Sequence, residues 1–374
     1  MKRIKHFLCL LAALAGFASC NGPMTSDEIM ESCGSGVVMV VNQYYYQLKL
    51  PTGKLWYFTG FDEDGDLENW TTDKDEIMKS RKMLTGTGFF ISSDGKIITN
   101  RHVASPDIKL SDTKKSVHQL LDAMATLVTH KMQQMSDRYD ELENEKKACY
   151  SYDPYDGSIS VDRDKLQEIE DEQSSLRETF HSDSELRDNI KQLDLSELQV
   201  ETACELGIAY NDTYVTNTSD LVPCVVTSVS DKENVDLAQL QLKSKSTPSN
   251  RHIFNIDSKQ DDKGFMDKVR GIFSSSDNEL KTEQKLYMIG FNAGFSLSNT
   301  SQGIKAQITS GAVSQKSDNN KIMYTIPSLP GSSGSPVVDE YGHLVAVNFA
   351  GVTNTQSFNY GIVLERVKAF VNDH

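Results

Sequence analysis

The sequence predicts a mainly-β protein with an inserted helical hairpin and a C-terminal helix. Short alternating or wholly apolar stretches, separated by glycine, proline and aspartate turns, fill residues 35–110, 200–250 and 251–361, as antiparallel strands do. Residues 111–199 instead repeat apolar side chains at spacings of three, four and seven, which is the helical period. A final run over residues 362–374 indicates a terminal helix. We therefore expect a first β region that is interrupted by helices, followed by a second β region.

Residues 1–19 form a pattern typical of a secretory signal peptide. Three basic residues within the first five precede an apolar run over residues 7–17 that is too short to span a bilayer. Small residues then lead into Cys20, an arrangement similar to a bacterial lipobox, which predicts cleavage after the signal and lipidation of Cys20. Residues 20–34 would form a polar tether. Ordinary secretion is the alternative, and either face of the cell envelope is compatible with the pattern.

Residues 86–103 predict a β-hairpin that turns at Asp94-Gly95, because an Asp-Gly pair between apolar runs is a strong hairpin signal. His102 closes the second strand of this hairpin. Its imidazole is the candidate general base for nucleophilic chemistry.

The segment between His102 and Asp236 is far longer than a strand connection needs. Apolar residues recur with the helical period over residues 117–142 and 166–193, and turn residues lie between them at 150–159. This pattern predicts an antiparallel, coiled-coil-like helical hairpin whose first arm, of about 35 residues, would reach on the order of 50 Å. Two interpretations stay open: a decorated loop with one apolar seam, or a lid or arm that binds a protein partner.

Asp236 precedes the alternating stretch 237–242, which predicts a half-buried strand. A carboxylate that enters a buried strand needs a polar partner, and an imidazole N–H would serve. Asp236 is therefore the candidate group that orients His102.

Residues 331–336 read Gly-Ser-Ser-Gly-Ser-Pro and lie between an extended run at 322–326 and an apolar strand at 337–338. Such small residues form a tight turn that lifts one hydroxyl, that of Ser333, into solvent. Glycine lets the backbone approach a bound carbonyl closely, so the N–H groups of Gly331 and Ser333 can converge on a developing oxyanion.

Three segments, residues 99–103, 235–240 and 331–336, resemble the catalytic motifs of trypsin-like serine peptidases with the chymotrypsin fold. The nearest branches are the HtrA-type and the glutamyl-endopeptidase enzymes. Further segments are similar to HtrA-type strands and the closing helix, namely residues 288–291, 307–314 and 361–368.

This resemblance implies two six-stranded-type antiparallel β-barrels. Residues 35–110 and 200–250 would form the first barrel, residues 251–361 the second, and residues 111–199 would be an insertion in the first. HtrA-type enzymes usually carry a peptide-binding PDZ domain after the second barrel, and the chain leaves no room for one, so PDZ regulation is not expected.

The resemblance also implies a serine endopeptidase that needs no cofactor. His102 would be the general base, Asp236 would orient it, and Ser333 would be the nucleophile. The N–H groups of Gly331 and Ser333 would form the oxyanion hole. The alternative is a catalytically silent, peptide-binding or scaffolding pseudo-protease that docks a partner through the helical insertion.

Neighbouring residues compete for these roles less well. The family motif places the nucleophile third in the hexapeptide, which disfavours Ser332 and Ser335. Asp220 and Asp231 do not open an alternating strand, which disfavours them as orienters. Pancreatic-type relatives carry an aspartate directly before the nucleophile that pairs with a freed amino terminus, and Ser332 stands there, so activation by that route is not expected.

The resemblance places Pro327, Asn348, Phe349 and Gly351 at the substrate-binding site. Asn348 stands where glutamyl endopeptidases have a histidine that helps to bind an acidic side chain, so strict glutamate preference is not expected. No acidic residue lies in residues 322–332, so a preference for Lys or Arg has no support either. We expect an apolar or small residue before the scissile bond.

Two further patterns bear on metals and thiols. The acidic run at residues 62–66 suggests a calcium loop, but Leu67 occupies the position where an EF-hand needs glycine, so we predict a solvated turn and no metal site. Cys204 and Cys224 lie in neighbouring extended runs and could form a cross-strand disulfide or remain buried free thiols.

The charge indicates which partners to expect. The formal net charge is −15, and loss of Lys2, Arg3 and Lys5 with the signal peptide would make it −18. Such a chain repels nucleic acid and anionic headgroups. We expect a polypeptide substrate, no nucleic acid, and membrane attachment only through a lipid on Cys20.

Overall fold

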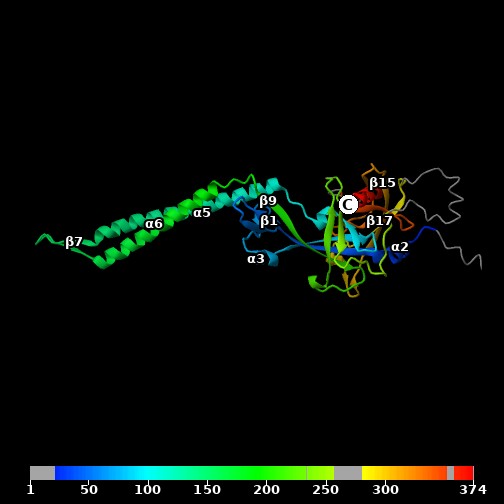
Figure 1. The fold of residues 1–374 in the computed structure, drawn as a ribbon, viewed down its shortest axis with the longest axis horizontal. Helices are drawn as coiled ribbons and strands as arrows, with labels where there is room; N and C mark the ends of the chain where they lie inside the picture. Colours follow the sequence, from blue (N-terminus) through cyan, green and yellow to red (C-terminus); the bar gives the residue numbers. More distant parts are fainter. Residues whose placement is uncertain (1–21, 233, 257–279, 352–357, 374) are drawn as a thin grey trace, which may run out of the picture. The chain divides into compact units, whose positions relative to one another are not determined.

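The computed structural model describes residues 22–232, 234–256, 280–351 and 358–373 (Figure 1). The predicted signal peptide and Cys20 lie outside these residues. The chain divides into two compact units, described in turn: one holds residues up to Tyr44, Met83–Pro106 and the chain from Cys204 onward, and the other holds Tyr45–Lys82 and Asp107–Ala203.

The first unit contains two closed β-barrels. In the first barrel each strand pairs with the next, and β1 also pairs with β9, which closes the ring. Its strands, in ring order, are β1 (Val37–Lys49), β5 (Lys82–Phe90), β6 (Lys96–Thr99), β11 (Ala238–Leu242), β10 (Val222–Val229) and β9 (Gln199–Tyr210). The predicted hairpin is present, because β5 and β6 pair antiparallel and Gly95 in the turn has φ +83°.

The second barrel is a ring of six antiparallel strands. In ring order they are β12 (Lys285–Gly290), β15 (Gln307–Gln315), β16 (Lys321–Tyr324), β19 (Asn359–Val363), β18 (Leu344–Gly351) and β17 (Pro336–Val338). Helix α9 (Leu364–Asn372) follows the last strand. The two six-stranded barrels, the helical hairpin and this helix confirm the predicted mainly-β fold class.

A shared hydrophobic core joins the two barrels. Met39 and Phe89 from the first barrel belong to the same buried cluster as Tyr287, Ile289 and Val347 from the second. Side chains that point to the other face of each strand fill the barrel interiors separately. The short element η1 (Gly34–Gly36) precedes β1. The short elements between the barrel strands are α4 (Arg101–Ala104), η2 (Thr218–Asp220), α8 (Phe295–Ser298), β13 (Asn299–Thr300) and β14 (Gly303–Ile304).

Part of the predicted tether at residues 20–34 is instead packed structure. Helix α2 (Ser26–Cys33) begins with a capping box between Thr25 and Glu28, and its Ile29 and Cys33 are buried in the shared core. The sequence shows only a polar stretch with an occasional apolar residue, because the surface that covers these two side chains comes from distant parts of the chain.

The second unit is built around a helical hairpin. Helices α5 (Leu110–Ala148) and α6 (Arg163–Lys191) run side by side, and a short ribbon of β7 (Tyr150–Tyr152) and β8 (Ile159–Val161) joins their far ends (Figure 1). At 1.5 Å per residue α5 is roughly 58 Å long. Leu142 and Ile169 pack between the helices.

Residues 50–81 differ from the prediction, which gave them to the first barrel. They form β2 (Leu55–Phe58), β3 (Gly60–Phe61), β4 (Leu67–Glu68) and α3 (Lys74–Lys79) in the second unit. Strand β2 pairs with the end of β1, outside the barrel ring. The aromatic residues that suggested barrel strands pack locally, Tyr45 against Tyr57 and Trp56 against Trp70.

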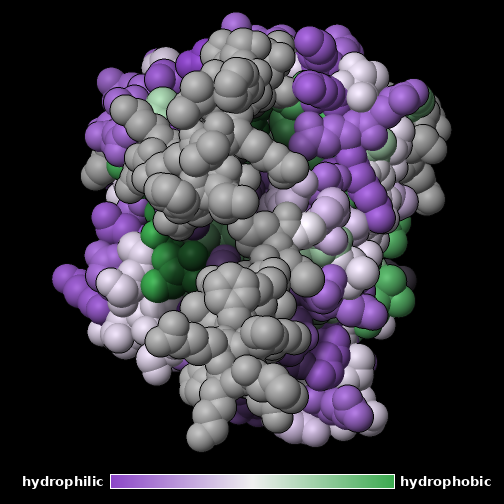
Figure 2. All heavy atoms as spheres, turned by 90° about the vertical axis from the view of Figure 1, so that its right-hand side faces the viewer, coloured by the Kyte–Doolittle hydropathy of each residue, from purple (hydrophilic) through white to green (hydrophobic). Residues whose placement is uncertain are grey.

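The surface is strongly polar. Figure 2 shows a face on which hydrophilic side chains prevail, with a small group of hydrophobic ones among them. Within the described residues, none of the helices combines the length and the apolar character that crossing a bilayer requires.

Candidate active site

The turn that carries Ser333 is seated against both barrels. Gly331 and Gly334 have φ of +98° and +88°, which strongly favours glycine at both positions. A Cβ on Gly331 would lie 2.4 Å from the carbonyl oxygen of Phe291, and a Cβ on Gly334 would lie 2.1 Å from that of Thr87. The turn therefore depends on glycine at these positions for both its conformation and its close fit.

Only one of the three serines in this turn is accessible. Ser332 and Ser335 are 1% and 0% exposed, whereas Ser333 is half-buried. The Ser332 hydroxyl donates to the carbonyl of Leu329 over 2.7 Å and is directed into the protein. Ser333 is thus the hydroxyl of the turn that a substrate can reach.

His102 and Asp236 form a pair with two contacts. Nδ1 of His102 lies 2.6 Å from Oδ2 of Asp236, and the backbone N–H of His102 donates to Oδ1 over 3.0 Å. Because both carboxylate oxygens bind the same residue, the ring is held with Nδ1 toward the acid and Nε2 away from it. The His102 side chain is 44% exposed and that of Asp236 18%.

The local elements around this pair differ from the prediction. His102 lies in the single-turn helix α4, not at the end of β6, and Asp236 lies two residues before β11 begins. Asn100 stabilises this arrangement, since its side-chain amide donates to the carbonyl of Asp236 over 2.7 Å. Directly after β6, therefore, both Asn100 and His102 contact Asp236.

Thr87 and Thr99 connect the His102 segment to the Ser333 turn. The N–H of Thr87 donates to the carbonyl of Ser333 over 2.8 Å, and the Thr99 hydroxyl donates to the carbonyl of Thr87 over 2.7 Å. A Cβ on Gly334 would lie 3.1 Å from Cα of Thr99. Gly334, the residue after Ser333, therefore lies against β6, the strand that ends three residues before His102.

A hydrogen bond from a neighbouring segment fixes the orientation of the Pro330–Gly331 peptide. The N–H of Ala293 donates to the carbonyl of Pro330 over 2.6 Å, so the Gly331 N–H, trans to that carbonyl, points the opposite way. Within the described residues the N–H groups of Gly331 and Ser333 have no protein acceptor. Both remain available to a substrate oxygen.

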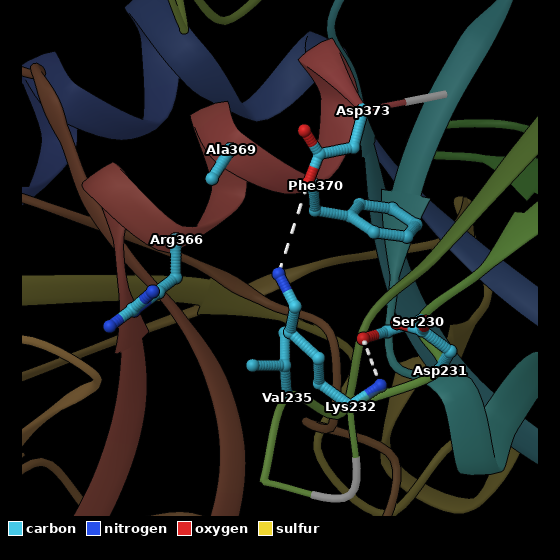
Figure 3. A pocket seen from close by; sticks show the side chains of 8 residues that line it. All are labelled: Ser230, Asp231, Lys232, Val235, Arg366, Ala369, Phe370 and Asp373. Atoms are coloured by element: carbon cyan, nitrogen blue, oxygen red, sulfur yellow. Dashed lines mark hydrogen bonds and ion pairs between the residues drawn. The ribbon is translucent and has the colours of Figure 1, made fainter.

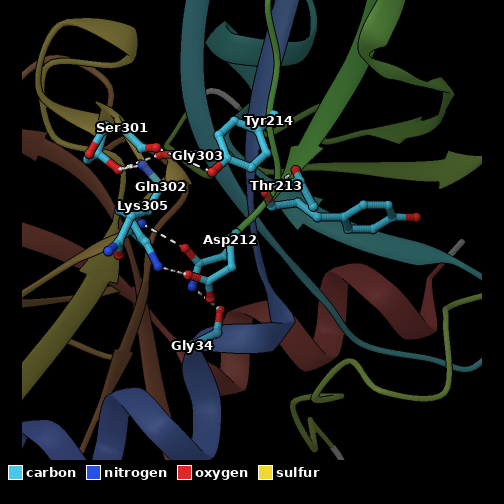
Figure 4. Close-up of polar contacts among 12 residues, drawn as sticks. Gly34, Asp212, Thr213, Tyr214, Ser301, Gln302, Gly303 and Lys305 are labelled. Atoms are coloured by element: carbon cyan, nitrogen blue, oxygen red, sulfur yellow. Dashed lines mark hydrogen bonds and ion pairs between the residues drawn. The ribbon is translucent and has the colours of Figure 1, made fainter.

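Polar contacts connect the segment between β12 and β15 to the residues that follow β9 (Figure 4). The Lys305 ammonium pairs with Asp212, and the Tyr214 hydroxyl donates to the carbonyl of Ser301 over 3.3 Å. Thr213 also forms a β-bridge with Ile304. These contacts join the segment between β12 and β15 to the residues that follow β9 of the first barrel.

The predicted substrate-binding residues fall into two groups. Pro327 is exposed and Phe349 is half-buried, whereas for Gly351 only the backbone, at the end of β18, is described. Asn348 is 1% exposed and bonds to Tyr324 and Ser332. The expectation that the Asn348 side chain contacts substrate is therefore wrong, because its amide is directed into the protein.

The disulfide alternative for Cys204 and Cys224 is wrong, because both are free thiols. Cys204 accepts a contact from the Asn42 amide at 3.4 Å. Burial raises the pKa of the Cys204 thiol, and it raises that of Cys224 to about 12. Both thiols belong to the interior of the first barrel.

A small cavity lies behind the loop that leads to Asp236 (Figure 3). Ser230, Lys232 and Val235 line it from the loop, and Arg366 and Phe370 line it from α9. Its volume of about 20 Å³ holds no more than a solvent molecule. It marks where the C-terminal helix supports the loop that leads to Asp236 and is too small for a substrate.

In the described parts of the chain no group of three or more His, Cys, Asp or Glu could hold a metal ion.

Two supporting residues were not found from the sequence. Thr87 gave no signal, because a threonine within a strand has no distinctive spacing. Ala293 lies just after the segment 288–291 that resembled HtrA-type enzymes, and its φ of +56°, unusual for alanine, could not be read from residue type.

One family model matches part of the chain. Residues 202–347 match the family model described as a trypsin-like peptidase domain, a stretch that contains Asp236 and Ser333. No curated protein matches the chain significantly. The match and the two closed six-stranded barrels together support a trypsin-like serine peptidase.

Proposed function

We propose that this protein is a serine endopeptidase that hydrolyses peptide bonds through Ser333, His102 and Asp236. The observation that carries the proposal is the two-point contact between Asp236 and His102, at 2.6 and 3.0 Å, beside a turn whose single accessible hydroxyl is Ser333. An acid that fixes one ring nitrogen leaves the other free to accept a proton.

In this mechanism Oγ of Ser333 attacks the peptide carbonyl while Nε2 of His102 takes the serine proton. The tetrahedral oxyanion accepts hydrogen bonds from the N–H groups of Gly331 and Ser333. The C–N bond then breaks as His102 returns the proton to the leaving amine. Water repeats the sequence on the acyl-enzyme, and Asp236 stays ionised and stabilises the imidazolium throughout.

The substrate is a polypeptide segment with an apolar or small residue before the scissile bond. Two features support this preference. No acid lies in residues 322–332 to pair with Lys or Arg, and the Asn348 amide is buried and engaged by protein groups. A peptide-library cleavage profile dominated by Arg, Lys or Glu would contradict it.

Hydrolysis itself is tested with an unfolded protein substrate and purified wild type, Ser333→Ala and His102→Ala. Both variants should lose activity by about 10⁴-fold or more and still unfold at the wild-type temperature. Retained activity in Ser333→Ala would contradict the proposal.

Among trypsin-like enzymes we place the protein nearest to the HtrA-type branch, on the similarity of residues 288–291 and 307–314.

We also propose that the mature chain is a bacterial envelope lipoprotein attached through Cys20. The signal pattern before Cys20 and the absence of acidic residues from its first 19 positions support this location. Cys20→Ala should shift the protein from the membrane fraction to the soluble envelope fraction. An unchanged membrane fraction would contradict a lipid anchor.

A second candidate function is partner docking by the helical hairpin, alongside or instead of hydrolysis. The β7–β8 ribbon pairs Tyr150 with Val161 and Tyr152 with Ile159, and all four side chains are exposed. Because alternate residues of a strand share a face, these four form one uncovered apolar face. The turn of the ribbon is acidic, with Asp153 and Asp156, whereas Lys147 and Arg163 flank the ribbon where it joins the helices, so the partner we propose is a protein with an apolar patch.

Replacing the ribbon, residues 150–161, with a short glycine-serine turn separates the two functions. Docking predicts that the cellular phenotype is lost while peptide hydrolysis by the purified protein is unchanged. A phenotype lost in Ser333→Ala but kept in the ribbon variant would favour hydrolysis alone.

A further inference from the structure

A buried, uncharged hydrogen-bond network lies beneath the turn that carries Ser333. The hydroxyl of Tyr324, on β16, donates to Oδ1 of Asn348, on β18, over 2.8 Å. Nδ2 of Asn348 donates to the carbonyl of Ser332 over 3.0 Å. Tyr324, Asn348 and Ser332 are all almost completely buried, so this chain of bonds has no competing water.

The Ser332 side chain completes the network. Its hydroxyl donates to the carbonyl of Leu329, so Ser328 donates the hydrogen of the 2.6 Å contact between the two serine hydroxyls. Nδ2 of Asn348 also lies 3.2 Å from Oγ of Ser332 and 3.3 Å from Oγ of Ser328. The residue directly before Ser333 is thus held through both its carbonyl and its side chain.

The backbone of Asn348 holds the other side of the turn. Its carbonyl accepts from the N–H of Gly334 over 2.8 Å, and its N–H donates to the carbonyl of Ser335 over 2.9 Å. Asn348 therefore contacts the residue before Ser333 with its side chain and the two residues after it with its main chain.

We propose that Asn348 is a positioning residue that fixes the conformation of the Ser333 turn, and that Tyr324 fixes the amide of Asn348. The catalytic role of the turn rests on the proposed hydrolase function. Since every member of the network is neutral, the turn is held without an ion pair beside Ser332. Burial raises the pKa of the Tyr324 hydroxyl, which keeps it protonated as a donor.

A first test compares Tyr324→Phe with the matched control Tyr287→Phe. Tyr287 is also a buried tyrosine of the second barrel, but its hydroxyl contacts the Met24 carbonyl at 3.5 Å. Tyr324→Phe leaves Oδ1 of Asn348 buried and without its donor. It should lower kcat for peptide hydrolysis about tenfold or more with little change in KM, whereas Tyr287→Phe should leave both unchanged. Equal effects of the two variants would overturn the proposal.

A second test uses Asn348→Asp and its pH dependence. The ionised carboxylate cannot donate to the Ser332 carbonyl, whereas the protonated acid can, and burial raises the pKa of a carboxyl. The activity of Asn348→Asp relative to wild type should therefore rise as the pH falls, and Asn348→Leu should show no such recovery. A ratio that is independent of pH in both variants would contradict a donor role for Asn348.

Amide hydrogen exchange tests the same proposal without any turnover. Tyr324→Phe and Asn348→Leu should speed exchange of the amides in residues 332–335 at least tenfold, with unchanged exchange in strand β10 of the first barrel. Unchanged exchange in residues 332–335 would overturn the positioning role even in an active enzyme. Faster exchange in a protein whose wild type hydrolyses no peptide would support the positioning role and refute the hydrolase function instead.

Discussion

Asp236→Asn is the substitution that most sharply tests the proposed proton path. It keeps the size of the side chain and the Oδ1 atom that accepts the His102 N–H over 3.0 Å. It replaces the other oxygen, 2.6 Å from Nδ1, with an amide that can only donate. Nδ1 must then become the acceptor, and the ring proton moves to Nε2.

A protonated Nε2 cannot take the proton of Ser333, so the loss comes from the wrong tautomer and not from lost packing. Such a substitution costs about 10⁴-fold in kcat, which is roughly 5.5 kcal/mol of transition-state free energy. The assay is kcat on a peptide substrate, with thermal unfolding as the control for folding. A loss smaller than tenfold in a folded variant would refute the assignment of Asp236.

Further predictions follow from backbone conformation, thiol burial and histidine burial. Gly331→Ala adds a Cβ 2.4 Å from the Phe291 carbonyl oxygen at φ +98°, so kcat should fall by about 10²- to 10³-fold. A wild-type kcat would contradict the proposed role of the Gly331 N–H in the oxyanion hole. Burial raises the pKa of Cys224 to about 12, so a disulfide reagent at pH 8 should label it only in denaturant, and rapid labelling of the native protein would contradict its burial. Burial lowers the pKa of His252, so below about pH 6.5 the unfolded chain binds a proton that the folded chain does not. Stability therefore falls as the pH falls. His252→Asn should therefore weaken the decrease in Tm between pH 7 and pH 5, and an unchanged slope would show that His252 titrates normally.

Local patterns were enough to predict several elements of both units. The Asp-Gly turn between apolar strands identified the β5–β6 hairpin, because turn chemistry and alternation lie within a few residues of each other. The glycine-serine hexapeptide identified the tight turn at Ser333, since Gly331 and Gly334 do adopt φ values that favour glycine. The long apolar repeat likewise identified α5 and α6.

Features that depend on distant contacts could not be predicted. The aromatic-rich run at residues 55–58 indicates a strand correctly, but not that β2 pairs outside the barrel ring. Nothing local shows that α2 packs into the shared core, because its covering surface comes from other elements.

The direction of side chains at the site shows the same limit. His102 was expected on a strand, and a single helical turn is too short to give a periodic signal. Asn348 was expected to face substrate, yet in a sheet a small register difference decides whether a side chain faces the ligand or the core. Here it faces Tyr324 and Ser332.

The central claim is that Ser333 is a nucleophile activated by His102, and covalent labelling measures this most directly. Intact and peptide mass spectrometry after reaction with a fluorophosphonate should show one adduct, on Ser333, in the wild type and in Tyr287→Phe. His102→Ala should react at least 10³-fold more slowly, and Ser333→Ala not at all. Folded wild-type protein without an adduct, or with an adduct that persists in Ser333→Ala, would contradict the account.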